Sequence, residues 1–322
     1  MAEYSQAVAS PISGSSVRPG DRVFGGLSKG AGILVLVIMA AIAIFLIWRA
    51  VPSLTNNTGN FFTESQWLPD ANPPRFGIAA LVFGTLVSSA IAMALAVPIG
   101  IGIALFIVQY APKPLASTLA FVTDLLAAVP SIIFGLWGLQ VLLPQSQGLQ
   151  IWMSDYLGWT VIFHNTQDLY GKSLFLASLV LTIMILPTVA AVSREVILQV
   201  PHGHKEAALA LGATRWEMVR MAVLPFAKPG MISAAMLGLG RALGETIAVA
   251  LILSAAFTVN VHLTEPGGNS FAANIALKWN EAGSNGLSAL IASGLVLFVM
   301  TLTVNMIARY IIARRAEFSG AN

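Results

Sequence analysis

The chain has 322 residues, of which 57% are hydrophobic and 10% are charged, with 17 Lys and Arg against 14 Asp and Glu. A soluble domain carries about 25% charged residues, so this composition excludes a disordered protein, a nucleic-acid-binding module and an ordinary cytosolic enzyme. It indicates an integral membrane protein, and the absence of cysteine excludes a disulfide framework, a thiolate metal site and a cysteine nucleophile.

Long stretches of apolar residues predict where the chain crosses the membrane, because about 20 such residues form a helix that spans a hydrocarbon core of roughly 30 Å. The six predicted spans cover residues 30–48, 77–107, 115–143, 173–193, 230–257 and 286–308. Pro98 and Pro130 predict a kink in the second span and a bend in the third. We therefore expect an all-α polytopic membrane protein with six transmembrane helices.

The distribution of Lys and Arg predicts the orientation, because short cytoplasmic loops carry an excess of these residues. With a cytoplasmic N-terminus, twelve of them fall in inner segments, four in outer segments, and one, Arg241, lies within a span. Both termini are therefore expected in the cytoplasm. The expected domains are an N-terminal tail of residues 1–29, one transmembrane domain of residues 30–313 and a C-terminal tail of residues 314–322.

The long inner loop of residues 194–229 predicts two short helices separated by a turn. Gly212 is typical of the end of the first helix, and Thr214 with Glu217 matches a capping box at the start of the second. Pro225 and Pro229 are expected to end that second helix. Helices this short are marginal in water unless they pack against something. The loop therefore predicts a docking surface for a cytoplasmic protein, with a purely structural loop as the alternative. The apolar residues available for docking are Leu209, Leu211, Trp216, Met218 and Met221.

The same loop resembles the EAA loop of ABC importer permeases. The matching residues, in the spacing of that motif, are Glu206, Ala207, Ala208, Gly212, Leu224 and Pro225. Ala222 departs from the motif, which often has Ile at this position. The resemblance implies that the helices of this loop sit in a groove on an ATP-hydrolysing subunit and transmit the closure of that subunit to the membrane.

Three further segments, residues 84–100, 128–138 and 238–246, resemble the C-subunit permeases of phosphate-specific ABC importers. The resemblance implies a type I ABC importer (MetI-like) permease fold in the bacterial cytoplasmic membrane. It also implies the partners: a homologous A-subunit permease, two ATPase subunits and an extracytoplasmic phosphate-binding protein, with inorganic phosphate as cargo and lipid around the spans. ATP and Mg would then belong to the ATPase, and this chain would be no enzyme.

Two short motifs fail as catalytic or metal sites. Gly171-Lys172-Ser173 resembles the end of a phosphate-binding loop, but that loop needs a glycine where Thr166 stands. His202 and His204 have no further ligands nearby in the sequence, whereas structural zinc requires four. We therefore predict no catalytic residue, metal site or cofactor in this chain.

The charges inside the spans are the candidate site. Each costs about 2.5–3.5 kcal/mol at mid-bilayer, so Arg241, Glu245 and Asp124 are expected to face the protein interior, to pair, or to line a path. Arg241 and Glu245 are four residues apart, which places them on one face of the fifth span, beside Gly240 and Gly244. Asp124 and Arg241 lie at similar depths, roughly 14 and 17 Å from the inner ends of their spans at 1.5 Å per residue.

One hypothesis is that Arg241 pairs with Glu245 or Asp124 at rest and with phosphate in transit. The alternative is a buried salt bridge that only locks the third and fifth spans together. Other functions remain open at this point: a permease for another oxyanion such as sulfate or molybdate, a secondary anion transporter or channel, or a phosphate sensor acting through the inner loop. Aromatic residues of the outer loop are expected either at the membrane interface or over the pore mouth. They are Trp152, Tyr156, Trp159 and Phe163.

Overall fold

A computed structural model of the chain describes residues 19–316. The chain divides into two compact units, residues 1–48 and residues 49–322. Helix α1 (Pro19–Asn56) begins in the first unit and carries the first predicted span. It starts within the predicted N-terminal tail, and the rest of that tail lies outside the described residues.

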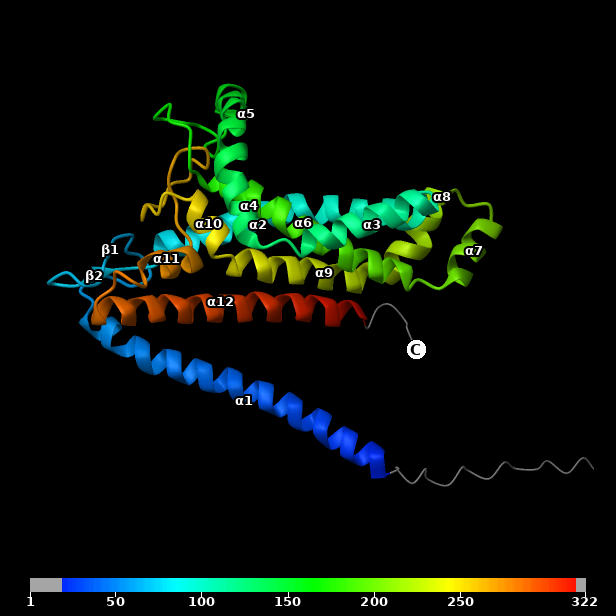
Figure 1. The fold of residues 1–322 in the computed structure, drawn as a ribbon, viewed down its shortest axis with the longest axis horizontal. Helices are drawn as coiled ribbons and strands as arrows, with labels where there is room; N and C mark the ends of the chain where they lie inside the picture. The colour runs from blue at the N-terminus through cyan, green and yellow to red at the C-terminus, as the bar shows by residue number, and fades with distance from the viewer. Residues whose placement is uncertain (1–18, 317–322) are drawn as a thin grey trace, which may run out of the picture. The chain divides into compact units, whose positions relative to one another are not determined.

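The second unit consists of helices and one small sheet (Figure 1). Its outer-loop strands are β1 (Trp67–Leu68) and β2 (Arg75–Phe76), which pair antiparallel. The helical elements, including three π-helical turns, are α2 (Ala79–Leu105), η1 (Phe106–Tyr110), α3 (Lys113–Ala127), α4 (Ser131–Trp137), η2 (Gly138–Leu142), α5 (Leu143–Leu157), α6 (Leu174–Leu198), α7 (His202–Ala210), α8 (Arg215–Met218), η3 (Val219–Val223), α9 (Leu224–Gly244), α10 (Ile247–Ile252), α11 (Phe271–Lys278) and α12 (Ser284–Ala316).

The predicted spans are confirmed as helices. Within the described residues, five helical segments are long and apolar enough to cross a membrane, and six if the bent pair 113–127 and 131–157 counts as one span. Pro98 lies inside α2, which runs through it without a break. Pro130 breaks the third span between α3 and α4, and the two segments meet at 92°. That bend is much sharper than expected.

The fifth span is also broken, which the sequence did not predict. α9 ends at Gly244, and α10 begins at Ile247. Glu245, between them, has extended backbone angles of φ −68° and ψ 125°. Its side chain accepts a hydrogen bond from the Ala248 amide, which is one of the free amides at the start of α10. The break is therefore a capped helix start.

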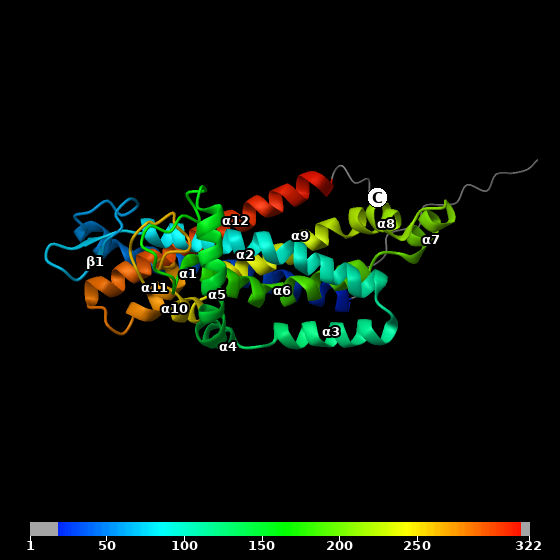
Figure 2. The same ribbon diagram turned by 90° about the horizontal axis from the view of Figure 1, so that it is seen from above.

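Helix α6 is the centre of the second unit. It packs against α2, α9 and α3, and Figures 1 and 2 show these four helices running along a common direction. Its buried side chains include Leu181, Met184 and Ile185. Gly100 of α2 lets the two helices approach closely, since a Cβ there would meet the Val189 side chain at 3.0 Å.

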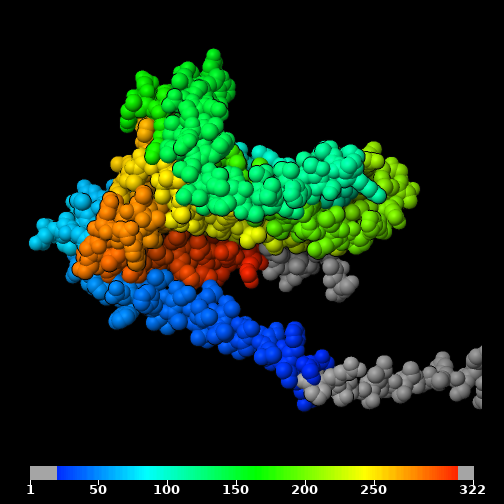
Figure 3. All heavy atoms as spheres, in the orientation of Figure 1, coloured from blue at the N-terminus to red at the C-terminus, as the bar shows by residue number. Residues whose placement is uncertain are grey.

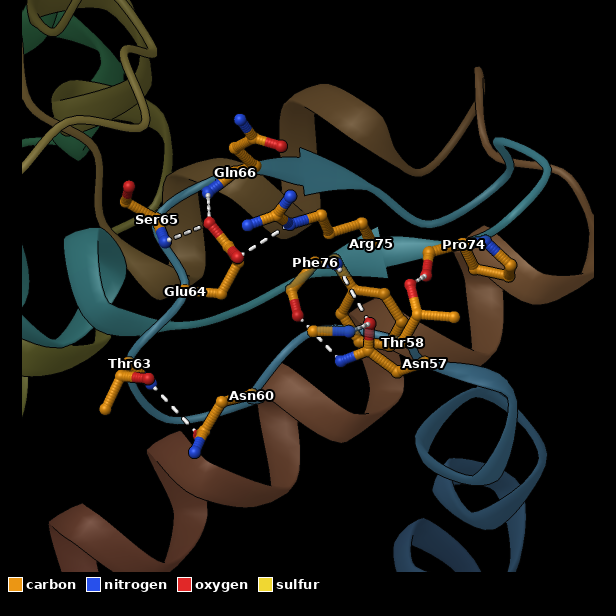
Figure 4. Close-up of polar contacts among 11 residues, drawn as sticks. Asn57, Thr58, Asn60, Thr63, Glu64, Ser65, Gln66, Pro74, Arg75 and Phe76 are labelled. Carbon is orange, nitrogen blue, oxygen red and sulfur yellow. Dashed lines mark hydrogen bonds and ion pairs between the residues drawn. The ribbon is translucent and has the colours of Figure 1, made fainter.

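The outer segment 57–76 is held by its own polar contacts (Figure 4). The Asn57 amide group donates to the Phe76 carbonyl at 2.8 Å, and its oxygen accepts from the Phe76 amide at 3.1 Å. Arg75 forms an ion pair with Glu64 at 2.8 Å. Hydrogen bonding to the Arg75 guanidinium holds the pKa of the Glu64 carboxyl below its usual value. These contacts hold the segment 57–76 in an ordered conformation.

Candidate functional site

Arg241 lies near the end of α9, where three helices meet. Its Nη1 donates to the Thr188 hydroxyl of α6 at 3.0 Å and to the Ala127 carbonyl at 3.4 Å. Ala127 is the last residue of α3, so this carbonyl has no partner within its own helix. A helix C-terminus carries partial negative charge, which partly compensates the guanidinium. The break in the third span thus leaves the Ala127 carbonyl free to accept a hydrogen bond from Arg241.

The prediction that Glu245 pairs with Arg241 is wrong. The two side chains share a helix face only if the helix continues, and α9 ends one residue before Glu245. Glu245 is 9% exposed and faces the amino end of α10, where partial positive charge favours a carboxylate. Each charge is therefore stabilised by a helix end of opposite polarity.

The prediction that Asp124 can meet Arg241 is also wrong. Asp124 forms an ion pair with Arg194 at 3.1 Å, and Arg194 also contacts Glu195 at 2.8 Å. Equal depth fixes the level of a side chain along the bundle but does not fix the direction in which it points. Arg194 lies within α6, which extends to Leu198, rather than in the inner loop. The pair joins α3 to α6 on the side of the break that leads to the α7–α8 loop.

Arg241 also borders a cavity of about 940 Å³. The other lining residues come from α9 and α12: Ser233, Met236, Leu237, Gly240, Asn305 and Arg309. Within the part of the chain that the structure describes, no group accepts a hydrogen bond from Nη2 or Nε of Arg241. These donors are available to an anion. From the sequence, Arg309 is only one of the charges that follow the last span, and nothing there links it to Arg241.

The inner loop forms the predicted helix, turn and helix. Gly212 has a φ of +83°, in the left-handed region that favours glycine. Both halves of the capping box form, since the Glu217 amide donates to the Thr214 hydroxyl at 3.3 Å and Glu217 accepts from the Thr214 amide at 2.7 Å. The hydrogen bonds from the Thr214 amide and hydroxyl lower the pKa of the Glu217 carboxyl.

The prediction that Pro225 and Pro229 end the second helix is wrong. α8, η3 and α9 form one helical segment from Arg215 to Gly244. Pro225 stands in the first turn of α9, directly after the π-helical turn η3. The widened turn interrupts the regular bonding where proline lacks its amide hydrogen. The loop therefore joins the fifth span directly.

One face of this loop packs on the helices, and the other is exposed. Met218, Val219 and Val223 are buried against Ala104 and Ile197. The prediction that Met218 is available for docking is therefore wrong. The remaining predicted docking residues are exposed. They are Leu209, Leu211, Trp216 and Met221, with Leu211 89% exposed.

The residues of the Glu-Ala-Ala motif lie on both sides of this division. Glu206, Ala207, Gly212 and Pro225 are exposed. Ala208 and Leu224 are partly buried and pack against the cluster that holds the loop. Among residues 19–316, no group of three or more His, Cys, Asp or Glu side chains is placed to hold a metal ion.

Solved structures show the class of fold. The chain superimposes on a bacterial alginate ABC transporter structure with a TM-score of 0.58, at 15% identity, covering 92% of this chain and 95% of that one. A structure of the MetNI methionine ABC transporter gives a TM-score of 0.51 at 20% identity, covering 74% of this chain and 94% of that one. The fold is therefore that of the membrane subunits of MetI-like ABC transporters.

The chain belongs to the family of binding-protein-dependent transport system inner membrane components, whose family model matches residues 96–317. It is 46% identical over 298 residues to the phosphate transport system permease protein PstC 2 of Mycobacterium tuberculosis, covering 91% of this chain and 92% of that relative. It is thus a multi-pass inner-membrane permease subunit and not itself an enzyme.

Proposed function

We propose that the chain forms half of the translocation path of an ATP-driven phosphate importer. The observation that carries this proposal is the position of Arg241, whose guanidinium has free donors at a large cavity between α9 and α12. Two relatives from Mycobacterium, which are named as phosphate transport system permease proteins, support phosphate as the cargo. Both termini would lie in the cytoplasm, as the Lys and Arg distribution favours.

The guanidinium of Arg241 suits this role because it stays charged when dehydrated and binds phosphate oxygens in a bidentate manner. A bare arginine would hold the anion too tightly for release. The Ala127 carbonyl and the Thr188 hydroxyl share its donors and so weaken its hold on phosphate. In this proposal the Ala127 carbonyl and the Thr188 hydroxyl take the place of the carboxylate that the sequence suggested as the partner of Arg241 at rest.

Glu245 and Asp124 remain in the proposed path with other partners. Glu245 holds the start of α10 beside the Arg241 position and would repel the anion once bound. Asp124 would act on the inner side, where its pair with Arg194 joins α3 to α6. A phosphate that moved inward would compete with Asp124 for Arg194, because both are anions and the Nη1 of Arg194 has no partner among the described residues.

The inner loop would receive the energy for transport. The resemblance implies contact with an ATPase for six motif residues, of which Glu206, Ala207, Gly212 and Pro225 are exposed and Ala208 and Leu224 are partly buried. We propose four kinds of partner: a homologous permease subunit, two ATPase subunits, an extracytoplasmic phosphate-binding protein, and membrane lipid. ATP and Mg would bind the ATPase, and this chain would need no cofactor. Because α8, η3 and α9 are continuous, movement of the loop would reach Arg241 through one helix.

Uptake of radiolabelled phosphate into vesicles that contain the assembled transporter tests the proposal. Arg241→Ala and Glu206→Lys are each expected to abolish ATP-dependent uptake, while Arg75→Ala, on the outer loop, leaves it unchanged. The Arg241 variant should retain the bound ATPase. Normal uptake by the Arg241 variant would exclude the path. Uptake that survives Glu206→Lys and follows an ion gradient would indicate a secondary transporter. Equal competition by sulfate or molybdate would indicate another oxyanion.

A further inference from the structure

Helix α5 buries two polar side chains and exposes several apolar ones, and its exposed residues also include Gln145, Gln147 and Asp155. Gln150 is fully buried, and its amide group donates to the buried Ser146 hydroxyl at 2.9 Å. Leu149, Trp152 and Tyr156 are exposed instead. A helix at a water surface places apolar residues inward and polar residues outward. A helix that exposes apolar and polar side chains together indicates surroundings with an apolar part and a polar part.

The exposed part of α5 has two different flanks. At 100° per residue, Leu149, Trp152 and Tyr156 share one flank, and the Trp152 and Tyr156 rings lie 5.6 Å apart. Gln147 and the partly buried Ser154 lie on the opposite flank, near the exposed Ile151, and Gln145 at the start of the helix shares the flank of Leu149. An exposed flank that carries Trp and Tyr fits the boundary between lipid tails and headgroups, where these two residue types are enriched.

The bend at Pro130 places α5 across the membrane spans. The 92° angle turns the segment 131–157 roughly perpendicular to α3, as Figures 1 and 2 show for α5. The 15 residues of α3 rise about 22 Å at 1.5 Å per residue, within a core of roughly 30 Å. The crossing segment therefore lies in the leaflet remote from the α7–α8 loop.

The chemistry of this region matches lipid better than a protein surface in water. Between Lys113 and Lys172 the sequence contains no Lys or Arg. The exposed apolar face of α3, which includes Phe121 and Leu125, continues into α4 at Ile133. Figure 3 shows α3 and the α4–α5 segment on the same face of the second unit. Because the apolar face of α4 continues that of α3, the lipid that surrounds the α3 span is expected to cover α4 as well.

We propose that α5 is an interfacial anchor, with Leu149, Trp152 and Tyr156 in the lipid of the leaflet remote from the α7–α8 loop and Gln147 toward the headgroups and water. The anchor would fix α4, which packs against α10: a Cβ on Gly135 would lie 2.8 Å from the Ala248 Cα. Ala248 is the residue whose amide Glu245 caps. The lipid contact of α5 would thus hold the region around the break in α9–α10, whatever anion is transported.

Spin labels test this placement, because the chain has no cysteine and each introduced cysteine is unique within it. Leu149→Cys, Trp152→Cys and Tyr156→Cys are labelled one at a time, with Gln147→Cys as the matched control on the same helix. The labelled full-length chain is reconstituted in phosphatidylethanolamine–phosphatidylglycerol vesicles, alone and assembled with its partner subunits. Accessibility of each label to oxygen and to a water-soluble nickel chelate is then measured.

The three apolar-flank labels are expected to collide more with oxygen than with the nickel chelate, and the Gln147 label to show the opposite preference. High nickel accessibility at all four sites would place α5 in water and overturn the proposal. Low accessibility to both reagents in the assembled transporter would mean that a partner protein covers α5, which would also overturn it.

A second measurement avoids spin labels. Lipids brominated on the acyl chain near the glycerol quench tryptophan fluorescence by contact. Trp152→Phe is expected to remove a measurable share of this quenching, whereas Trp216→Phe, in the loop beyond the membrane, leaves it unchanged. Equal quenching of the wild type and the Trp152 variant would show that Trp152 does not touch lipid and would overturn the proposal.

Discussion

Single residues in this protein are stabilised by helix ends as much as by opposite charges. Arg241 binds the terminal carbonyl of α3, and Glu245 binds a free amide of α10. Broken helices expose such groups inside the membrane, where water cannot satisfy them and where each costs several kcal/mol if left unpaired. The two charges and the two breaks therefore stabilise each other, which explains why the intramembrane charges need no direct ion pair between them.

The Thr188 hydroxyl is expected to position Arg241 for transport. Thr188→Val removes this acceptor while keeping the shape of the side chain. A hydrogen bond to a charged group contributes about 1.5–3 kcal/mol, so phosphate uptake should fall by about tenfold or more. Thr188→Ser keeps the acceptor and should restore uptake to near the wild-type rate. If the Val and Ser variants transport equally, Thr188 does not position Arg241.

At the scale of elements, close approach between segments is set by a few glycines. Gly84 of α2 faces the loop before α11, and a Cβ there would overlap the Asn269 carbonyl oxygen. A backbone atom cannot turn aside as a side chain can, so this contact has to be relieved by moving the loop away from α2. Gly102, on the same helix, has no atom within 4 Å of such a Cβ.

This pair of glycines gives a matched prediction. Gly84→Ala should lower the thermal unfolding temperature of the detergent-purified chain strongly, because overpacking costs about 1–3 kcal/mol or more. Gly102→Ala should leave it unchanged or raise it slightly, since alanine favours the helix by up to about 1 kcal/mol. Similar melting temperatures for the two variants would contradict the close contact between α2 and the Asn269 segment.

Two outer loops are joined through Glu265. Its carboxylate accepts hydrogen bonds from the Thr166 amide at 2.7 Å, the Thr166 hydroxyl at 2.6 Å and the Asn260 side chain at 2.6 Å. Burial by itself raises the pKa of Glu265, but these bonds and the nearby His262 outweigh burial, so its pKa lies below the usual value. A carboxyl whose pKa is lowered by folding stabilises the folded loops only in its ionised form.

The Glu265 contact should therefore be fully present above pH about 4.3, the ordinary pKa of glutamate, and weaken as the pH falls through the lowered pKa. Hydrogen exchange of residues 160–167 in the reconstituted chain, corrected for intrinsic rates, should accelerate over that range. Glu265→Gln should exchange faster at all pH values and without this acid step. If hydrogen exchange still accelerates at low pH in the Glu265→Gln variant, a group other than Glu265 causes the acceleration.

At the scale of the whole molecule, the positions of the charges predict which ends face the cytoplasm. Cysteines introduced at Asn60 in the outer loop and at Glu206 in the inner loop are then unique within the chain. In right-side-out vesicles a membrane-impermeant maleimide should label Asn60→Cys but not Glu206→Cys until the vesicles are opened. Labelling of Glu206→Cys in sealed vesicles would reverse the proposed orientation.

Features that depend on residues close together in the chain were predictable from the sequence. They are the apolar stretches, the capping box at Thr214 and Glu217, and the turn at Gly212. Three features were not predictable from the sequence: the break at Glu245, the pairing of Asp124 with Arg194, and the contact of Arg241 with Ala127. Each depends on where one helix ends against another, and neither spacing along a helix nor depth in the membrane fixes the direction of a side chain. The sequence by itself determined a MetI-like permease with several membrane spans and a loop that forms a helix, a turn and a second helix. Only the tertiary structure decided which groups surround its intramembrane arginine, because packing between distant segments selects those partners.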